Sequence, residues 1–460
     1  MLNTLKKLLR KCKVLDQASS KDTQTEKPYQ EMPALHIAEL EIGEGWASNT
    51  INTTIFRHHA ILTLNNAQYT AFYVNTTTLR IIKRDLATDR LESHDISGTF
   101  NLHDAHNGIS LGFDRKGRLH ITYDHHASRL QYRISRKPHA INDWTESRSM
   151  TDAHEDNVTY PSFILPRMDF PLTFLYRDGS WNKGKARLKY FDEQTDSWSD
   201  LKEPVLSGAD LRPWTANAYW NHPCVGRDGS LHVSYVWRTH SLPPNQLINN
   251  INVCYAKSVD NGLTWFTSKG LQYQTPITPV NSEVICAISP GSNLINQCGM
   301  ALDSNNLPHI VFYANDENNI PQYQHLWFDG ITWRTQIISS RLESFSLQGG
   351  GTLEIPISRP DIIISDNNDA HVIFRGDLTG DRMAILSLES PDYKYNSSRI
   401  ALIDPEPLGR SEPIIDRSRW STEGILSIVI QKCQQPNHDE PKAETLSSIR
   451  ILDLKLRNKS

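Results

Sequence analysis

The side chains best suited to acid–base chemistry are concentrated in one part of the chain. His106 and His126 lie in residues 101–126, NLHDAHNGISLGFDRKGRLHITYDHH, and Tyr160 and Arg177 follow downstream. Imidazole exchanges protons near neutral pH, and a guanidinium binds a carboxylate through two parallel hydrogen bonds. Together these side chains suit proton transfer on an acidic substrate.

Short β-strands must position these residues. From about residue 35 onward, apolar and β-branched runs recur between Gly, Asn, Asp and Pro, with almost no helical periodicity. His106 and His126 are predicted on strands separated by one turn, so that both face the same end of a sheet, with Tyr160 and Arg177 on adjacent sheets. The predicted strands include residues 60–64, 69–74, 119–124, 172–177, 231–238, 309–314, 370–375 and 425–431.

Two sequence repeats indicate the fold. A polar turn followed by His and an apolar strand occurs at 113–124, 226–237, 302–313 and 365–375. The spacing, roughly 55–75 residues per unit, suits four strands and their loops. Residues 258–265, SVDNGLTW, match the Asp-box turn. We therefore predict an all-β, seven-bladed β-propeller of four-stranded antiparallel blades over residues 35–456, after a basic and polar extension at 1–34. A pair of β-sandwiches is the alternative, but it would leave the repeat spacing accidental. The histidines of the repeat, predicted to be structural, are His120, His232, His309 and His371.

The chain resembles the BNR-4 repeat propellers, which include ulvan lyases and related glucuronate-specific lyases and rhamnosidases. The resemblance extends from about residue 40 to 455 and rests on residues 103–126, VTYPSF (158–163), FLYRDGSWNKG (174–184), SYVWR (234–238), the Asp-box and LGRSEPIIDRSRW (408–420). It implies uronate chemistry and places the family's two catalytic histidines at His106 and His126. It also places the family's tyrosine at Tyr160 and its arginine at Arg177.

The chemistry of β-elimination fits those residue types. Removing a proton next to a carboxylate builds negative charge on that carboxylate, which an arginine fork can neutralise. Arg177 is the candidate for this role, with His126 and Asn107 assisting. His106 and Tyr160 are the candidate acid and base, and the sequence leaves open which is which. No cofactor is required for this chemistry.

Further candidates are less specific. Asn107, Arg238 and His125 are predicted to bind substrate, although Arg238 could instead pair within its blade and His125 could be a bystander. A structural zinc or calcium ion is a second hypothesis, because His222 and Cys224 share a strand face and Cys/His sets bind zinc. Buried, reduced cysteines are the alternative. The candidate metal ligands are His222, Cys224, His240 and Cys254.

Composition limits the partners. The chain carries 48 Lys and Arg against 52 Asp and Glu, so the basic excess of a nucleic-acid-binding protein is absent. No run of about 18 apolar residues predicts a membrane span. Residues 1–15, MLNTLKKLLRKCKVL, are a basic amphipathic stretch, and their Lys and Arg interrupt the apolar core of an export signal. Disorder or a short helix is expected there, with a membrane-surface helix or a degenerate signal as alternatives.

Three functions remain in competition. The first is a lyase that acts on an acidic polysaccharide or oligosaccharide, and the others are a glycoside hydrolase of the rhamnosidase type and a glycan-binding propeller without activity. Hydrolysis usually requires two carboxylates, which the set of His, Tyr and Arg does not supply. Such a lyase would be secreted or periplasmic, whereas the lack of a clean signal favours the cytoplasm. A monomer is expected.

Overall fold

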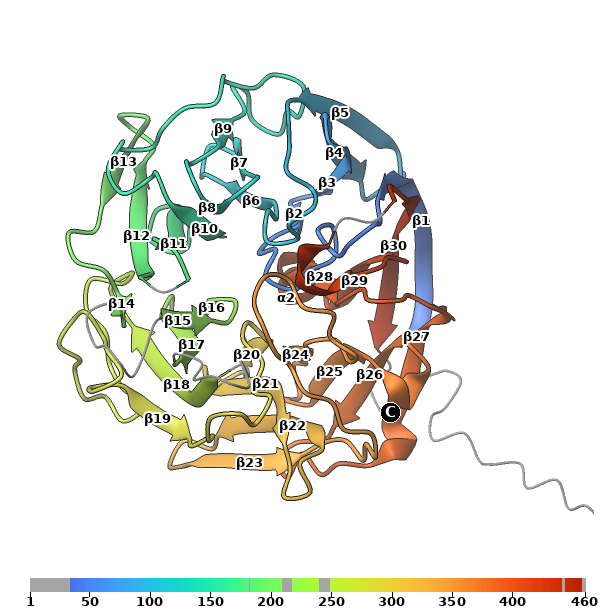
Figure 1. Cartoon of the computed structure of the whole chain (residues 1–460). Helices are drawn as coiled ribbons and strands as arrows, with labels where there is room; N and C mark the ends of the chain where they lie inside the picture. The colour runs from blue at the N-terminus through green and yellow to red at the C-terminus, as the bar shows by residue number, and fades with distance from the viewer. Residues whose placement is uncertain (1–33, 182, 209–216, 240–248, 441–442, 457–460) are drawn as a thin grey trace, which may run out of the picture.

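The computed structural model describes residues 34–181, 183–208, 217–239, 249–440 and 443–456. Within these ranges the strands form seven sheets arranged around a ring (Figure 1). This arrangement confirms the predicted all-β propeller of seven antiparallel blades. The predicted extension at 1–34 lies almost wholly outside the described residues and stays a prediction.

The blades follow the order of the chain with two exceptions. The first strand of the third blade precedes the last strand of the second, and the last blade takes its outer strand from the N-terminal side. The strands of the first three blades are β2 (Ile61–Leu64), β3 (Ala67–Asn75), β4 (Thr78–Asp85) and β5 (Leu91–Ser97); β6 (Ser110–Phe113), β7 (Leu119–Thr122) and β9 (Tyr132–Ile134); and β8 (His126–Ser128), β10 (Val158–Ile164), β11 (Thr173–Asp178), β12 (Lys185–Asp192) and β13 (Ser197–Asp200), with β14 (Leu206–Ser207) beside β12.

The remaining four blades complete the ring. Their strands are β15 (Asn217–Trp220), β16 (Cys224–Val225), β17 (Leu231–Arg238), β18 (Asn250–Ser258) and β19 (Glu283–Cys286); β20 (Met300–Leu302), β21 (Pro308–Asn315), β22 (Pro321–Phe328) and β23 (Trp333–Ile337); β24 (Asp361–Ile364), β25 (Ala370–Arg375), β26 (Arg382–Leu388) and β27 (Ile400–Pro407); and β28 (Ile414–Ile415), β29 (Ile425–Gln431), β30 (Leu446–Leu456) and β1 (Ala34–Trp46).

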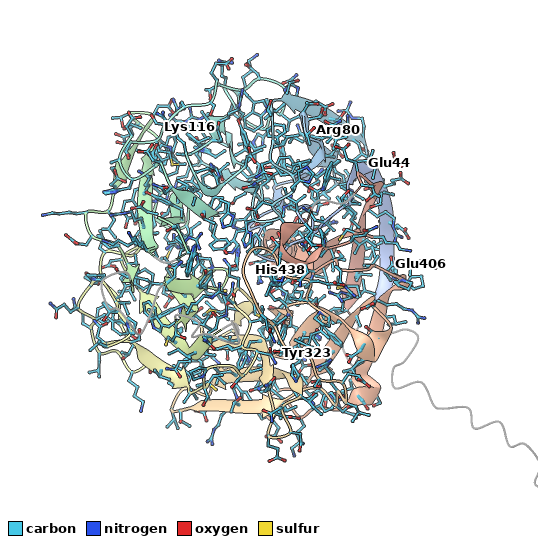
Figure 2. The ribbon with its side chains drawn as sticks, in the orientation of Figure 1. Glu44, Arg80, Lys116, Tyr323, Glu406 and His438 are labelled. Carbon is cyan, nitrogen blue, oxygen red and sulfur yellow. The ribbon has the colours of Figure 1, made fainter. Side chains whose placement is uncertain are left out.

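Strands from the two ends of the described chain close the ring. β1 pairs antiparallel with β30 from Ala34 opposite Leu456 to Trp46 opposite Leu446. The pairing buries the outer edge of β30, and closing the ring in this way leaves each blade packed between two others. Figure 2 shows Glu44 of β1 and Glu406 of β27 at the outer rim of the ring.

Helical segments are few and short. The α-helix α2 (Arg417–Glu423) follows β28, and single 3-10 turns occupy Asp377–Thr379, Ser397–Arg399 and Asn437–Asp439. Asp416 caps α2 by accepting a hydrogen bond from the Arg419 backbone N–H, and Gly424 ends it in the left-handed conformation. In the described part of the chain, no helix has both the length and the apolar character needed to cross a membrane.

The repeat residues have structural roles. In the Asp-box, Asp260 accepts a hydrogen bond from the Thr264 backbone N–H at 2.8 Å, and the indole of the buried Trp265 donates to the Gly262 carbonyl at 3.0 Å. The four repeat histidines are buried, and each bonds a side chain of a neighbouring strand. The pairs are His120 with Tyr132, His232 with Tyr255, His309 with His325, and His371 with Ser387.

Candidate active site

The two predicted histidines lie side by side. His106 belongs to the loop that precedes β6, whereas His126 begins β8, which pairs with β10 of the next blade. Their imidazole rings stack with centroids 4.2 Å apart. The predicted strand position of His106 was therefore wrong, but the expected proximity of the two rings is present.

A single carboxylate, that of Asp104, binds both rings. Asp104 Oδ1 accepts hydrogen bonds from His106 N at 3.0 Å and from His106 Nδ1 at 2.6 Å, and Oδ2 accepts one from His126 Nδ1. Burial works to raise the pKa of Asp104, but the hydrogen bonds and charges of the two histidines hold it well below its usual range. Because an ionised carboxylate only accepts hydrogen bonds, both Nδ1 atoms carry protons. Each imidazole therefore exchanges a proton through Nε2.

The same three residues could also bind a metal ion. The potential ligand atoms of Asp104, His106 and His126 all lie within 4.8 Å of one another. However, the Nδ1 atoms are already bonded to the carboxylate. Metal binding would compete for the atoms that now orient the rings, so the observed geometry favours a hydrogen-bonded pair.

Phe56 connects the histidines to the tyrosines of the site. Its ring stacks on His106 with centroids 5.7 Å apart and meets Tyr160 edge-on at 5.3 Å. The guanidinium of Arg359 lies 5.0 Å from the Phe56 centroid. Arg359 donates from Nε to the buried carboxylate of Glu412 at 2.8 Å. The charge of this arginine is therefore already compensated.

Tyr160 has an unusual backbone conformation. Its φ is +53°, and the register of β10 against β11 shifts between Thr159 and Ser162. A bulge of this kind re-aims a side chain that a regular strand would hold in the sheet, and a left-handed tyrosine is a strained conformation typical of functional sites. The local fold thus directs the Tyr160 ring toward Phe56 and His106.

Arg177, near the end of β11, is the most deeply buried of the predicted catalytic residues. Its side chain is 1% exposed, and Nη2 donates to Thr159 Oγ1 at 3.1 Å. Its guanidinium lies 4.9 Å from the Tyr160 ring centroid and 5.9 Å from that of Tyr219. A Cβ at Gly184 would lie 2.6 Å from Arg177 Cδ, so only glycine fits beside this arginine. Among the described residues, no carboxylate forms an ion pair with Arg177.

Arg238 and Tyr219 form the neighbouring part of the site. Arg238 ends β17 and is partly exposed. Its three nitrogens donate to Asn250 Oδ1 at 2.9 Å, Tyr219 Oη at 3.1 Å and Asn296 Oδ1 at 2.8 Å. Within the described parts of the chain, these acceptors include no carboxylate. Arg238 therefore presents a positive charge that is held in place by neutral groups, which suits an acidic ligand.

The two tyrosines differ in acidity. Burial and the neighbouring Tyr219 raise the pKa of Tyr160 above its usual range, against the opposing effect of nearby arginines. Burial also works to raise the pKa of Tyr219, but Arg238, Arg177 and hydrogen bonding from Asn217 more than offset it, so the net direction is downward. Tyr219 is thus the more acidic phenol of the pair.

Two predicted substrate-binding residues do not reach the site surface. The buried Asn107 donates its amide to the Asn101 carbonyl at 2.7 Å. The buried His125 accepts a hydrogen bond at Nε2 from the Gln131 backbone N–H at 2.6 Å, and burial lowers its pKa to about 3. Both side chains support the loops around the histidine pair.

The predicted metal ligands do not gather into a site. Among the described residues, His222, Cys224 and Cys254 do not form a group of ligand atoms within 4.8 Å. Burial raises the pKa of the Cys224 thiol to about 12, and Sγ donates to the Met300 carbonyl at 3.0 Å. Zinc binds thiolates, so these residues do not fit it. His240 lies outside the described residues, and the complete set of four stays a prediction.

A glycine-rich loop reaches the histidine pair from the far side of the ring. Thr352 Oγ1 lies 3.2 Å from His106 Nδ1. Its loop is held by His438, whose Nδ1 bonds the Gly350 carbonyl at 2.9 Å, and Figure 2 places His438 near the middle of the ring. A Cβ at Gly349 would meet the His438 ring at 2.3 Å. Residues from distant parts of the sequence thus complete the site.

The comparisons with known proteins agree with this architecture. The BNR repeat-containing family matches residues 67–341, which is more than half of the chain. The chain belongs to this family. A search of curated protein sequences finds no match.

Solved structures show the same fold. The polysaccharide lyase Uly1 superimposes with a TM-score of 0.68 at 13% identity, over 93% of this chain and all of that one. A PL25 ulvan lyase bound to -[GlcA(1-4)Rha3S]- superimposes with a TM-score of 0.62 at 13% identity, over 89% of this chain and 95% of that one. At this identity, the likeness establishes the propeller fold alone.

Proposed function

We propose that this protein is a polysaccharide lyase that cleaves a uronic-acid-containing glycan, ulvan-like or rhamnose–glucuronate, by β-elimination. The observation that carries the proposal is the pair Arg177 and Arg238. Both guanidiniums lie beside acid–base side chains, and neither has a carboxylate partner among the described residues. A uronate carboxylate would supply the missing negative charge.

The proposed reaction uses each part of the site. A base removes the proton from C5 of the uronate, and the electrons of the C5–H bond form the C4=C5 double bond. The C4–O4 bond breaks, and an acid protonates the leaving oxygen. Negative charge that develops on the carboxylate is stabilised by Arg238, which is partly exposed, with the buried Arg177 adding to the local positive potential. The histidine pair and the tyrosine pair supply the acid and the base.

Hydrolysis is less well supported. Glycosidases generally use two carboxyl groups, one of which must carry a proton at working pH. Among the described residues of the site, Asp104 is bonded to two histidines and has a depressed pKa, and Glu412 is paired with Arg359. Neither carboxylate is available as a proton donor.

The comparisons support the substrate class. The fold is shared with two polysaccharide lyases, one of them bound to -[GlcA(1-4)Rha3S]-. The substrate of this chain would be a similar acidic polysaccharide or its oligosaccharides. The enzyme would act on it as a monomer. We propose no cofactor for the chemical step.

The test is digestion of ulvan and of rhamnose–glucuronate glycans, followed by the ultraviolet absorbance of the unsaturated uronate. Only elimination produces this chromophore, so we expect it to form and to be lost in His106→Ala and Tyr160→Phe. His94→Ala, on the outer strand β5, is the matched control and should behave as wild type. New reducing ends without the chromophore would indicate hydrolysis, and binding without turnover would indicate a glycan-binding propeller. Either result would overturn the proposal.

A further inference from the structure

Tyr219 belongs to the tyrosine pair of the site, but the reaction described above assigns it no step of its own. It lies on β15, and its side chain is 2% exposed. The guanidinium of Arg238 lies 4.3 Å from its ring centroid, and that of Arg177 lies 5.9 Å away. The Tyr219 hydroxyl accepts a hydrogen bond from Arg238 Nη1 at 3.1 Å. Two cations thus face one phenol.

The charge balance around this phenol is incomplete. Arg177 is buried at 1% exposure and has no carboxylate partner in the described parts of the chain. Its Nε, although buried, also lacks a hydrogen-bond acceptor. A buried cation without a counter-ion is strongly destabilising. The rings of Tyr160 and Tyr219 lie beside its guanidinium, and a tyrosine hydroxyl is a group that can become an anion.

In the part of the chain that the structure describes, three charged or titratable groups face Tyr219. They are Arg177 from β11, Arg238 from β17 and Tyr160 from β10, whose ring lies 5.9 Å away. Two phenolates at this distance would repel each other, so the pair can hold one negative charge. Tyr219 is the member bonded to a guanidinium through its oxygen, whereas Tyr160 contacts Arg177 through its ring face. The charge therefore belongs on Tyr219.

We infer that Tyr219 rests as a phenolate between Arg177 and Arg238 and that it accepts the C5 proton in the elimination. The second half of this inference rests on the proposed function. In the reaction, the proton moves from C5 to Tyr219 Oη, the C4=C5 double bond forms, and the C4–O4 bond breaks. The leaving oxygen takes the proton of Tyr160, which is a neutral phenol before the reaction, and the neighbouring His106 then restores a proton to Tyr160. Arg238 then faces both the base and the substrate carboxylate.

The hydroxyl is suitably placed for this role. The hydrogen bond between Arg238 and Tyr219 is only partly buried, in contrast to the Tyr219 ring. When a uronate carboxylate binds Arg238, it withdraws part of the charge that stabilises the phenolate. Substrate binding would therefore make Tyr219 a stronger base at the moment when one is required.

The first measurement requires no substrate. The ultraviolet difference spectrum of the full chain at pH 7.5 should show one tyrosinate per chain, although a free tyrosine has a pKa of about 10. The band should vanish in Tyr219→Phe and persist in Tyr160→Phe. Tyr235→Phe is the matched control, because Tyr235 is a buried tyrosine of the same blade that bonds Ser282 and that, among the described residues, neither bonds nor stacks with an arginine. Absence of the band in wild type, or its persistence in Tyr219→Phe, would overturn the inference.

A second measurement tests the role in catalysis. Replacing Tyr219 by 3-fluorotyrosine, a more acidic phenol, should move the acidic limb of the kcat profile to lower pH, whereas a structural role would leave that limb in place. Tyr219→Phe should lower kcat at least a hundredfold without weakening substrate binding. An unmoved limb would refute the base assignment. If the tyrosinate band is present but no substrate yields an unsaturated product, the proposed function fails while the resting phenolate stands.

Discussion

Replacement of Asp104 by Asn tests the central feature of the histidine pair. The two side chains have the same shape, so the loop before β6 should keep its fold. Asn can still accept a hydrogen bond at Oδ1 from His106, as Asp104 does at 2.6 Å. Its Nδ2, however, would oppose the Nδ1–H of His126, because both groups are donors. The substitution therefore removes one hydrogen bond and the negative charge shared by both rings.

The expected loss follows from this contact. A hydrogen bond to a charged partner contributes about 1.5–3 kcal/mol, and about 1.4 kcal/mol corresponds to a tenfold change in rate. We expect kcat to fall about 10- to 150-fold, because a proton that moves through either imidazole requires an imidazolium that Asp104 stabilises. The assay is the initial rate of unsaturated uronate formation at saturating substrate, with circular dichroism and thermal unfolding to verify the fold.

The matched control is Asp124→Asn. Asp124 is a neighbouring, partly buried carboxylate that accepts a hydrogen bond from the Asn101 backbone N–H at 3.1 Å. It should keep kcat within about twofold of wild type, because no charge at the imidazoles changes. A folded Asp104→Asn enzyme with wild-type kcat would refute the role of the carboxylate, and an equal loss in both variants would show a general effect of the charge in this loop.

Three further predictions concern charge and stability. Arg238→Lys should lower kcat/KM about tenfold or more in steady-state kinetics, because an ammonium cannot bond two amides and a phenol in the geometry of the guanidinium; an unchanged value would contradict this. Glu412→Gln should lower the free energy of unfolding in urea by about 3–5 kcal/mol, since it leaves Arg359 buried without a counter-ion; a loss below about 1 kcal/mol would argue against that pairing. The pKa of Asp104 is depressed in the folded state, so its carboxylate stabilises the fold above the unfolded pKa of about 3.9, and this contribution is lost as the pH falls toward the folded value. The free energy of unfolding of wild type should therefore fall relative to that of Asp104→Asn between about pH 5 and pH 2. A difference between the two proteins that stays constant over this range would be inconsistent with the depressed pKa.

The fold was predictable because each blade repeats a local pattern. The turn, His and apolar strand of residues 226–237 form β17 and its preceding turn, and Trp265 packs under the Asp-box as expected. Ring closure was not readable from the sequence. The pairing of β1 with β30 joins residues about 410 positions apart, and no local pattern in either strand specifies its partner.

The site was predicted only where it depends on local spacing. His106 and His126 meet because one short blade segment separates them. The sequence His-Asp-Ala-His places the carboxylate of Asp104 two residues before His106, which indicated that the two side chains are close. The orientation of a loop carboxylate, however, is set only when the loop folds. Tyr219 stands in an ordinary strand, Asn217–Trp220, and its acidity arises from arginines on two other strands. Electrostatic contacts between residues that are far apart in the chain cannot be read from the local sequence.

The distribution of charge explains why one site can hold both an acid and a base. On the histidine side, the carboxylate of Asp104 contacts both rings, whose centroids lie 4.2 Å apart, and balances the positive charge of an imidazolium that forms there. On the tyrosine side, Arg177 and Arg238 carry two positive charges, and the phenolate of Tyr219 compensates one. The site is left with one positive charge, which matches one uronate carboxylate. Tyr219→Phe would leave two, and the variant should therefore bind sulfate or phosphate more tightly than wild type does, even though it no longer turns over substrate. Competition of these anions with oligosaccharide binding measures that difference, and equal affinities in the two proteins would refute the charge assignment.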